Sequence, residues 1–274
     1  MNNKDFRVKR DGPIARITLC QPQKANALGL DFWKNFEAAL TDLNDGNTRA
    51  LIIDAEGKNF CAGIDTELLS GDNFVTDTAQ HRLRIVELAE RLQTILGSLE
   101  QLRFPTIAVV QGACIGAGLE LAICCDFRIC SRDAYFQIGE TNVGIMADLG
   151  ALQRLPHMLP YGVAVDMAMS GSRLPALRAF DLGFIYGYQD APLNAANELA
   201  DRLTNKSPLA LAGIKRSILY ARDHPINDGL LHCAALQGGI FDHTSVQNTL
   251  GANSGSDKVL QKNLHMPFSN FSGD

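Results

Sequence analysis

The sequence predicts a mainly parallel α/β fold. Through the first two thirds of the chain, segments with the pattern of β-strands alternate with segments of helical periodicity, which is typical of units of strand, crossover helix and strand. Two strand-like segments, 50–55 and 106–113, are largely apolar runs, as expected for strands that are covered on both faces. From about residue 191 the patterns are helical, so we expect a helical C-terminal section outside the core.

The individual elements follow from local patterns. Asp11, Gly12 and Pro13 separate two short segments of strand character, which predicts a β-hairpin near the N-terminus. Apolar residues at helical spacing predict a helix over 29–45 and a long amphipathic helix over 79–101.

The middle of the chain supplies further core elements. Residues 116–125 are apolar on all sides and predict a buried helix. Residues 126–131 and 134–139 predict further strands of the same core. We therefore expect three parts, namely a core over 1–195, a helical region over 196–256 and a tail over 257–274.

Composition narrows the class of protein. With 274 residues, 46% of them hydrophobic, the chain can bury a large core. The net charge is −5 and the 25 Lys and Arg residues are scattered, which argues against a nucleic-acid or anionic-membrane surface. The seven cysteines have no CxxC spacing and predict buried reduced thiols, while the six scattered histidines give no metal-site pattern. No apolar run reaches about 18 residues and no targeting signal is recognised, so we expect a cytoplasmic protein.

A glycine-rich turn is the first motif that bears on chemistry. Gly112, Gly116 and Gly118 follow a predicted strand and precede a predicted helix, a pattern also found in nucleotide-binding turns. Its position in mid-chain, and the absence of YxxxK and Walker motifs, argue against a nucleotide site. The glycines would also allow close packing of strand and helix. In either case the helix start presents free backbone N–H groups that can stabilise an oxyanion.

A second loop, 57–65, follows the predicted strand at 50–55. Loops after the strands of a parallel sheet converge on one edge, so this loop and the glycine-rich turn can each donate one N–H to the same oxygen. Taken by itself the loop is typical of a surface turn.

Three carboxylates, Glu120, Glu140 and Asp148, lie in apolar or glycine-rich sequence. Burying a carboxylate without a partner is costly, and such groups often mark functional sites. The alternative for each is a buried salt bridge or a helix cap.

Four motifs follow one another along the chain, namely QPQKANALGLDFW, GKNFCAGID, GACIGAGLELAICCDFRIC and FQIGETNVGIMADLGALQRLP. Taken together and in order, they resemble the crotonase superfamily of acyl-coenzyme A enzymes over about residues 5–220. The resemblance implies a crotonase-like spiral of ββα units with a C-terminal helical region that builds trimers, often paired into hexamers. The last motif is most similar to dienoyl-CoA isomerases, which move double bonds from the 3,5 to the 2,4 positions.

The resemblance implies roles for individual residues. Ile64 and Ala117 match the positions whose backbone N–H groups form the oxyanion hole, and Glu120 and Glu140 match the two catalytic glutamates of hydratases. Asp148 falls where dienoyl-CoA isomerases carry an aspartate and hydratases a small residue. The isomerases carry aspartate at the first position, so Glu120 departs from their pattern towards the hydratases.

Substrate binding is implied by a further set of matching positions. Coenzyme A is part of the substrate and no separate cofactor is expected. Lys24 could equally be a solvated surface charge. The positions that match the segments around the CoA adenine and phosphates are Lys24, Ala25, Ala27, Ala62 and Asp65.

The implied reaction is isomerisation of a 3,5-dienoyl-CoA to a 2,4-dienoyl-CoA. Glu140 and Asp148 form the expected proton-transfer pair, with base and acid unassigned, and Glu120 orients or polarises its neighbours. The alternatives are a 2-enoyl-CoA hydratase of fatty-acid β-oxidation, an RNA-binding relative and a silent scaffold. The expected partners are an acyl-CoA thioester and further copies in a homotrimer or hexamer, without nucleic acid or membrane. Apolar faces after residue 191, which include Leu199 and Ile218, favour such assembly.

Overall fold

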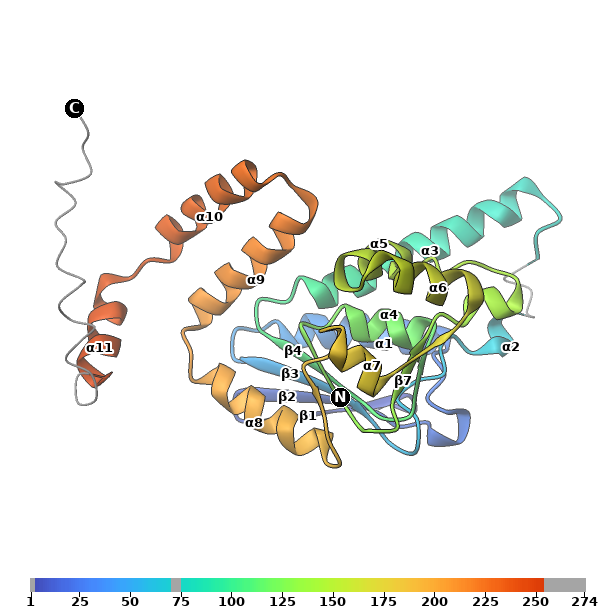
Figure 1. Ribbon diagram of the computed structural model, residues 1–274, viewed down its shortest axis with the longest axis horizontal. Helices are drawn as coiled ribbons and strands as arrows, with labels where there is room; N and C mark the ends of the chain where they lie inside the picture. Colours follow the sequence, from blue (N-terminus) through green and yellow to red (C-terminus); the bar gives the residue numbers. More distant parts are fainter. Residues whose placement is uncertain (1–2, 70–74, 254–274) are drawn as a thin grey trace.

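The computed structural model describes residues 3–69 and 75–253 and contains two sheets within these ranges (Figure 1). In the six-stranded sheet, β1 and β2 pair in antiparallel fashion, which confirms the predicted hairpin, and the remaining neighbours are parallel. The mainly parallel prediction is thereby confirmed for this sheet. In spatial order its strands are β1 (Phe6–Asp11), β2 (Ile14–Leu19), β3 (Ala50–Ala55), β4 (Thr106–Val110), β6 (Phe127–Cys130) and β9 (Gly187–Tyr188).

A second sheet of three short strands lies beside the first. It contains β5 (Ala113–Ile115), β7 (Tyr135–Gln137) and β8 (Arg173–Pro175). The prediction of one strand over 106–113 is therefore wrong, because β4 ends at Val110 and β5 belongs to the other sheet. Gly112 makes this change of direction, with φ at +54° and no room for a side chain: a Cβ would lie 2.3 Å from the carbonyl oxygen of Lys58.

Helices cover both faces of the large sheet (Figure 1). On one face, α8 (Pro192–Thr204) packs Leu199 against Ile52 and Ile107. The other face meets the larger core cluster, to which several helices and the second sheet contribute. Among these helices are α1 (Leu30–Leu43), α3 (Ala79–Glu100), α4 (Ala117–Ile123) and α5 (Ala151–Met158).

Further elements lie among the described residues of the region over 1–195. They are η1 (Pro22–Lys24), α2 (Thr66–Leu69), η3 (Glu140–Val143), α6 (Tyr161–Ser170) and α7 (Ala176–Asp181). The predicted division after residue 195 falls inside α8.

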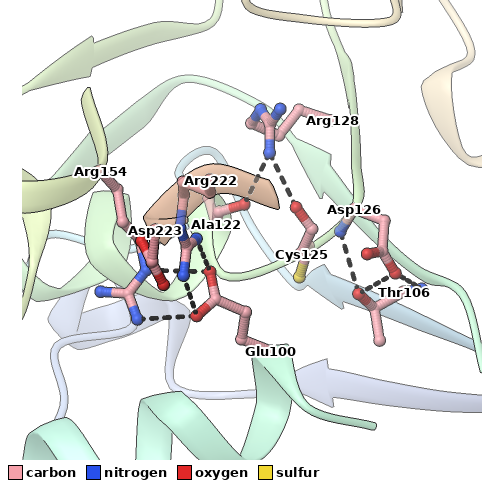
Figure 2. A network of polar contacts seen from close by, with 9 residues as sticks. All are labelled: Glu100, Thr106, Ala122, Cys125, Asp126, Arg128, Arg154, Arg222 and Asp223. Atoms are coloured by element: carbon pink, nitrogen blue, oxygen red, sulfur yellow. Dashed lines mark hydrogen bonds and ion pairs between the residues drawn. The ribbon is translucent and has the colours of Figure 1, made fainter. Parts of the chain in front are cut away.

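Helix α4 is buried along its whole length, as its apolar sequence predicts. Arg128 stabilises its C-terminal end by donating from Nη1 to the carbonyl oxygens of Ala122 (3.4 Å) and Cys125 (2.8 Å), as Figure 2 shows. A cation at this end of a helix also complements the helix dipole. The position of Glu120, in the first turn of α4, is therefore firmly set.

The C-terminal helices extend away from the sheets (Figure 1). Two ion pairs hold α9 to the rest of the protein, from Lys215 to Asp126 (2.8 Å) and from Arg222 to Glu100 (2.7 Å). The described helices continue as far as residue 253. The predicted tail over 257–274 lies outside the described residues, and the division at residues 195 and 256 stays a prediction. The helices are α9 (Pro208–Asp223), α10 (Ile226–Ile240) and α11 (His243–Asn253).

The apolar faces after residue 191 divide into two groups. Leu199 is buried against the sheet, whereas Ile214 and Ile218 on α9 and Leu231 on α10 are more than half exposed. Within residues 3–69 and 75–253, no helix combines the length and the apolar content needed to cross a bilayer.

Gly118 allows a close approach between α4 and the segment around Cys61, and Gly97 in α3 provides a comparison without such a contact. A Cβ on Gly118 would lie 2.6 Å from the Cβ of Cys61, whereas one on Gly97 in α3 would meet nothing within 4 Å. We expect Gly118→Ala to lower the free energy of unfolding by about 1–3 kcal/mol through overpacking. Gly97→Ala should raise it by about 0.5–1 kcal/mol through helix propensity. Urea denaturation of both variants measures the difference, and equal stabilisation would disprove the tight contact.

Candidate active site

One cavity of about 170 Å³ brings together the three carboxylates that the sequence singles out. Glu120 comes from α4, Glu140 from η3, and Asp148 from the turn before α5. The rest of the lining is mainly apolar, and much of it comes from α3 and from the segment after η3. These apolar residues are Ile85, Leu88, Ala89, Leu92, Val143, Ile145 and Leu149.

The two predicted loops meet at this cavity. Cys61 pairs with β5 through two hydrogen bonds. The Cys61 N–H donates to Ala113 O (3.0 Å), and the Ile115 N–H donates to Cys61 O (2.9 Å). A Cβ on Gly63 would lie 3.6 Å from the backbone nitrogen of Ala117, so the loop passes directly beside the start of α4. The backbone nitrogens of Ile64 and Ala117 thus belong to adjacent segments at the cavity wall.

Neither of these two N–H groups has an acceptor among the described residues. Around Ile64, the flanking groups are used instead: Leu28 N–H donates to Gly63 O (2.8 Å) and Asp65 N–H donates to Leu28 O (3.0 Å). Ala117 is the first residue of α4, where N–H groups lack an intrahelical partner. Two free donors beside each other at a cavity wall can stabilise one oxyanion.

Glu120 is almost completely buried, with 1% of its surface exposed. Its Oε1 accepts hydrogen bonds from the N–H groups of Leu149 (3.0 Å) and Ala151 (3.0 Å). Burial raises the pKa of Glu120 to about 8, and the charges of Glu140 and Asp148 act in the same direction, while the two N–H donors oppose the shift. This carboxyl group therefore holds its proton near neutral pH.

Glu140 lies directly over the glycine-rich turn. A Cβ on Gly116, whose φ is +53°, would lie 2.8 Å from Glu140 Oε1, so only glycine leaves room for this carboxylate. Its Oε2 is buried and has no hydrogen-bond partner in the described part of the chain. Burial raises the pKa of Glu140, and the charge of Asp148 raises it further. A carboxylate oxygen of this kind, next to a cavity, is available to a reacting group.

Asp148 is the most accessible of the three acids. Its backbone carbonyl accepts a hydrogen bond from Gln93 Nε2 on α3 (2.6 Å), and partial burial raises the pKa of its side chain. The three acids thus differ in burial within one cavity, which separates their proton affinities.

The residues expected to bind CoA lie mainly around a second hollow. Lys24, Ala27 and Asp65 line this depression, while Ala62 lines the cavity of the acids. Lys24 Nζ pairs with Asp65 (3.0 Å) and with Glu67 (3.2 Å). Ile64 and Asp65, which are adjacent in sequence, border the two hollows.

Ala25 does not line either hollow. It has a left-handed backbone conformation, with φ at 49°, and its carbonyl accepts the N–H of Ala62 (3.0 Å). Ala25 therefore fixes the cavity loop at its base.

Several contributors to the site were not predicted. The amphipathic pattern of 79–101 predicts a helix, but not that its apolar face lines this cavity. Gln93 bonds to a main-chain carbonyl, and Leu149 and Ala151 contribute main-chain N–H groups. Contacts of this kind do not require a particular residue type and so cannot be recognised in a sequence. Among the described residues, no group of three His, Cys, Asp or Glu side chains is arranged to hold a metal ion.

Comparison with known proteins agrees with this geometry. Residues 9–255 match the family model described as Enoyl-CoA hydratase/isomerase. The chain belongs to the enoyl-CoA hydratase/isomerase family. The predicted membership of the crotonase superfamily is thereby confirmed, and the protein is an enzyme of that family.

Two relatives and one solved structure show the extent of the similarity. The protein is 36% identical to a peroxisomal Delta(3,5)-Delta(2,4)-dienoyl-CoA isomerase of Arabidopsis thaliana, over 90% of this chain and 92% of the relative. It is 35% identical to a mitochondrial protein of the same activity name from Dictyostelium discoideum, over 83% and 80% of the two chains. An enoyl-CoA hydratase from Polaromonas sp. JS666 superposes with a TM-score of 0.83 at 28% identity, covering 91% and 96%. The predicted α/β crotonase fold, with C-terminal helices, is confirmed.

The raised pKa of Glu120 in this hydratase/isomerase-family protein makes its stability depend on pH. Since the ordinary pKa of 4.5 rises to about 8, the folded state holds a proton that the unfolded chain has released, and the free energy of unfolding falls as pH rises between these values. Glu120→Gln should match the wild type at about pH 5 and exceed its melting temperature by about 4 °C or more at about pH 9.

Thermal unfolding across this pH range measures the effect. Glu198→Gln, at an exposed position on α8, is the control and should keep the wild-type pH dependence. Parallel curves for wild type and Glu120→Gln would show that Glu120 is ionised in the folded protein.

Proposed function

We propose that this protein is a dienoyl-CoA isomerase that converts a 3,5-dienoyl-CoA thioester into the 2,4-dienoyl-CoA. The observation that carries the proposal is the position of Asp148, a third acid in the same cavity as Glu120 and Glu140. Two glutamates suffice to activate one water, whereas proton transfer between distant carbons benefits from two separate acids. The names of the two relatives above support the same reaction.

The chemistry follows from the arrangement of donors and acids. The thioester oxygen accepts the N–H groups of Ile64 and Ala117, which stabilise the negative charge that develops when a proton leaves C2. The electron pair of that C–H bond shifts the C3–C4 and C5–C6 double bonds to C2–C3 and C4–C5 as a proton is added at C6. Glu140 and Asp148 remove and supply these two protons, one acting as base and the other as acid.

Glu120 has a supporting role in this proposal. Its proton is held near neutral pH, and Oε1 is occupied by two backbone donors. It therefore polarises its neighbours and keeps a second negative charge away from the enolate.

The two hollows suit the two ends of an acyl-CoA. We place the acyl chain in the cavity, whose α3 side is apolar, and the CoA phosphates near Lys24. Lys24 would exchange at least one carboxylate partner for phosphate on binding. The seven free cysteines support a reducing compartment, for which we propose the cytoplasm.

Hydration of a 2-enoyl-CoA is the second candidate function. Glu120 and Glu140 lie in one cavity, as a hydratase would need, and Glu120 departs from the aspartate expected in the isomerases. The proposed preference is for isomerisation because Asp148 has no evident use in adding one water.

Replacing Asp148 by Asn tests the assignment. Asn keeps the size of the side chain but cannot accept or supply the proton, so isomerisation should fall at least about 100-fold with little change in CoA-ester binding.

In the wild type, kcat/KM for the dienoyl-CoA should exceed that for hydration of a 2-enoyl-CoA by about tenfold or more, and Asp148→Gly should narrow this ratio.

Ultraviolet spectra with both substrates give these rates. Asp181→Asn, at an exposed position at the end of α7, serves as control and should behave as the wild type. Faster hydration than isomerisation by the wild type would replace the isomerase assignment with the hydratase one.

The C-terminal helices support assembly into a homotrimer or a hexamer. Ile218 and Leu231 expose 66% and 72% of their surface, which a monomer would leave in water. Sedimentation at micromolar concentration should therefore give about three or six times the mass of one chain. Ile218→Glu should weaken the assembly, and a monomeric wild type would contradict the proposal.

A further inference from the structure

A buried ion-pair network lies behind the turn that carries Asp148. Arg154 on α5 donates from Nε and Nη2 to the two oxygens of Glu100 at the end of α3, each at 3.1 Å. The side chains of Arg154 and Glu100 are 15% and 8% exposed. Figure 2 shows both guanidinium groups, of Arg154 and of Arg222, directed at this carboxylate. The two-pronged contact fixes the plane of the Arg154 guanidinium.

The remaining branch of Arg154 packs on the turn itself. Gly150 has φ at +113°, and a Cβ placed on it would lie 1.8 Å from Arg154 Nη1. The guanidinium thus occupies the space that a side chain at position 150 would fill. Arg154 N–H also donates to the carbonyl of Gly150 (3.0 Å), so side chain and main chain of one residue enclose the turn.

The residues on either side of Gly150 serve the cavity. Leu149 and Ala151 supply the two N–H groups that bond to Glu120 Oε1, and Asp148 carries one of the proposed proton-transfer groups. Gln93 holds the carbonyl of Asp148 from the α3 side. A small displacement of this turn would therefore disturb two of the three acids together.

We propose that Arg154, oriented by Glu100, is a positioning residue for the reaction: its guanidinium sets the Asp148–Ala151 turn and thereby the geometry of Asp148 and Glu120. This role rests on the proposed function for the identity of the reaction, but not for the structure of the turn. Arg154 itself does not line the cavity, so it acts through the turn and not on the substrate.

Arg222 provides a matched comparison within the same network. It bonds to the same two oxygens of Glu100, at 2.7 and 3.4 Å, and its side chain is 22% exposed. It comes from α9, however, and its hydrogen bonds and ion pairs within the described residues go to Glu100 and Asp223, not to the turn. Removing either arginine leaves Glu100 paired with the other, so neither variant strands a buried charge.

The experiment compares Arg154→Met with Arg222→Met in the full-length protein. For Arg154→Met we expect kcat to fall at least about 30-fold with KM within about threefold of wild type, because misplacement of reacting groups affects the transition state more than binding. For Arg222→Met we expect kcat within about threefold of wild type. Melting temperatures of both variants are measured alongside, to relate kcat to stability.

Hydrogen exchange of the peptide over 147–153 gives a readout that does not depend on any substrate. Amides 149 and 151 should exchange at least about tenfold faster in Arg154→Met and at the wild-type rate in Arg222→Met. If the wild type hydrates 2-enoyl-CoA instead of isomerising, kcat is compared on that reaction, where Glu120 is also needed, and the exchange result stands unchanged.

Two outcomes would overturn the positioning role. One is wild-type kcat and wild-type exchange in Arg154→Met. The other is an equal loss of kcat in both variants, which would assign the effect to general destabilisation. Arg154→Lys adds a conservative variant, since it keeps the charge but not the forked contact: recovery of stability without recovery of kcat supports the role, and full recovery of kcat would assign it to charge.

Discussion

The close contact between the Cys61 segment and the start of α4 is the constraint on which the site depends. Cys61 pairs with β5 as a strand would, and Gly118 lets the first turn of α4 approach the Cys61 side chain without a Cβ between them. This approach brings the unpaired N–H groups of Ile64 and Ala117 to one wall of the cavity. It also fixes the helix that carries Glu120, so the oxyanion donors and the deepest acid are set by the same packing.

Burial of Glu120 carries an energetic cost that its neighbours offset only in part. Two backbone N–H groups stabilise the charged form, while removal from water and the two nearby acids favour the neutral form. Because the neutral form of Glu120 prevails near neutral pH, the folded protein is less stable there than it would be with glutamine at position 120. Such local loss of stability is typical of functional sites, where the arrangement serves chemistry and the rest of the core compensates.

The sequence was sufficient to predict elements with a strong period and residues that carry their own chemistry. The hairpin, the helix at 79–100, the buried α4 and the candidate acids all have local signatures. The sequence did not indicate that the run over 106–113 divides between two sheets. The left-handed backbone of Gly112 depends on its tertiary contact with the segment around Lys58, which the local sequence does not reveal. Nor could it pair Glu100 with Arg154 and Arg222, since these residues lie far apart in sequence and the pairing depends on how α3, α5 and α9 pack.

A gradient of burial across the cavity links these features to the proposed reaction. Glu120 is enclosed, Glu140 is partly buried against Gly116, and Asp148 is accessible. Three carboxylates with equal surroundings would repel one another and titrate as an ill-defined group. Unequal burial instead leaves the innermost acid protonated and lets the outer two differ in charge. A proton shuttle requires one ionised and one protonated acid beside the same substrate. The fixed turn at Gly150 holds Asp148 and the N–H donors to Glu120 in position, and so preserves their different degrees of burial.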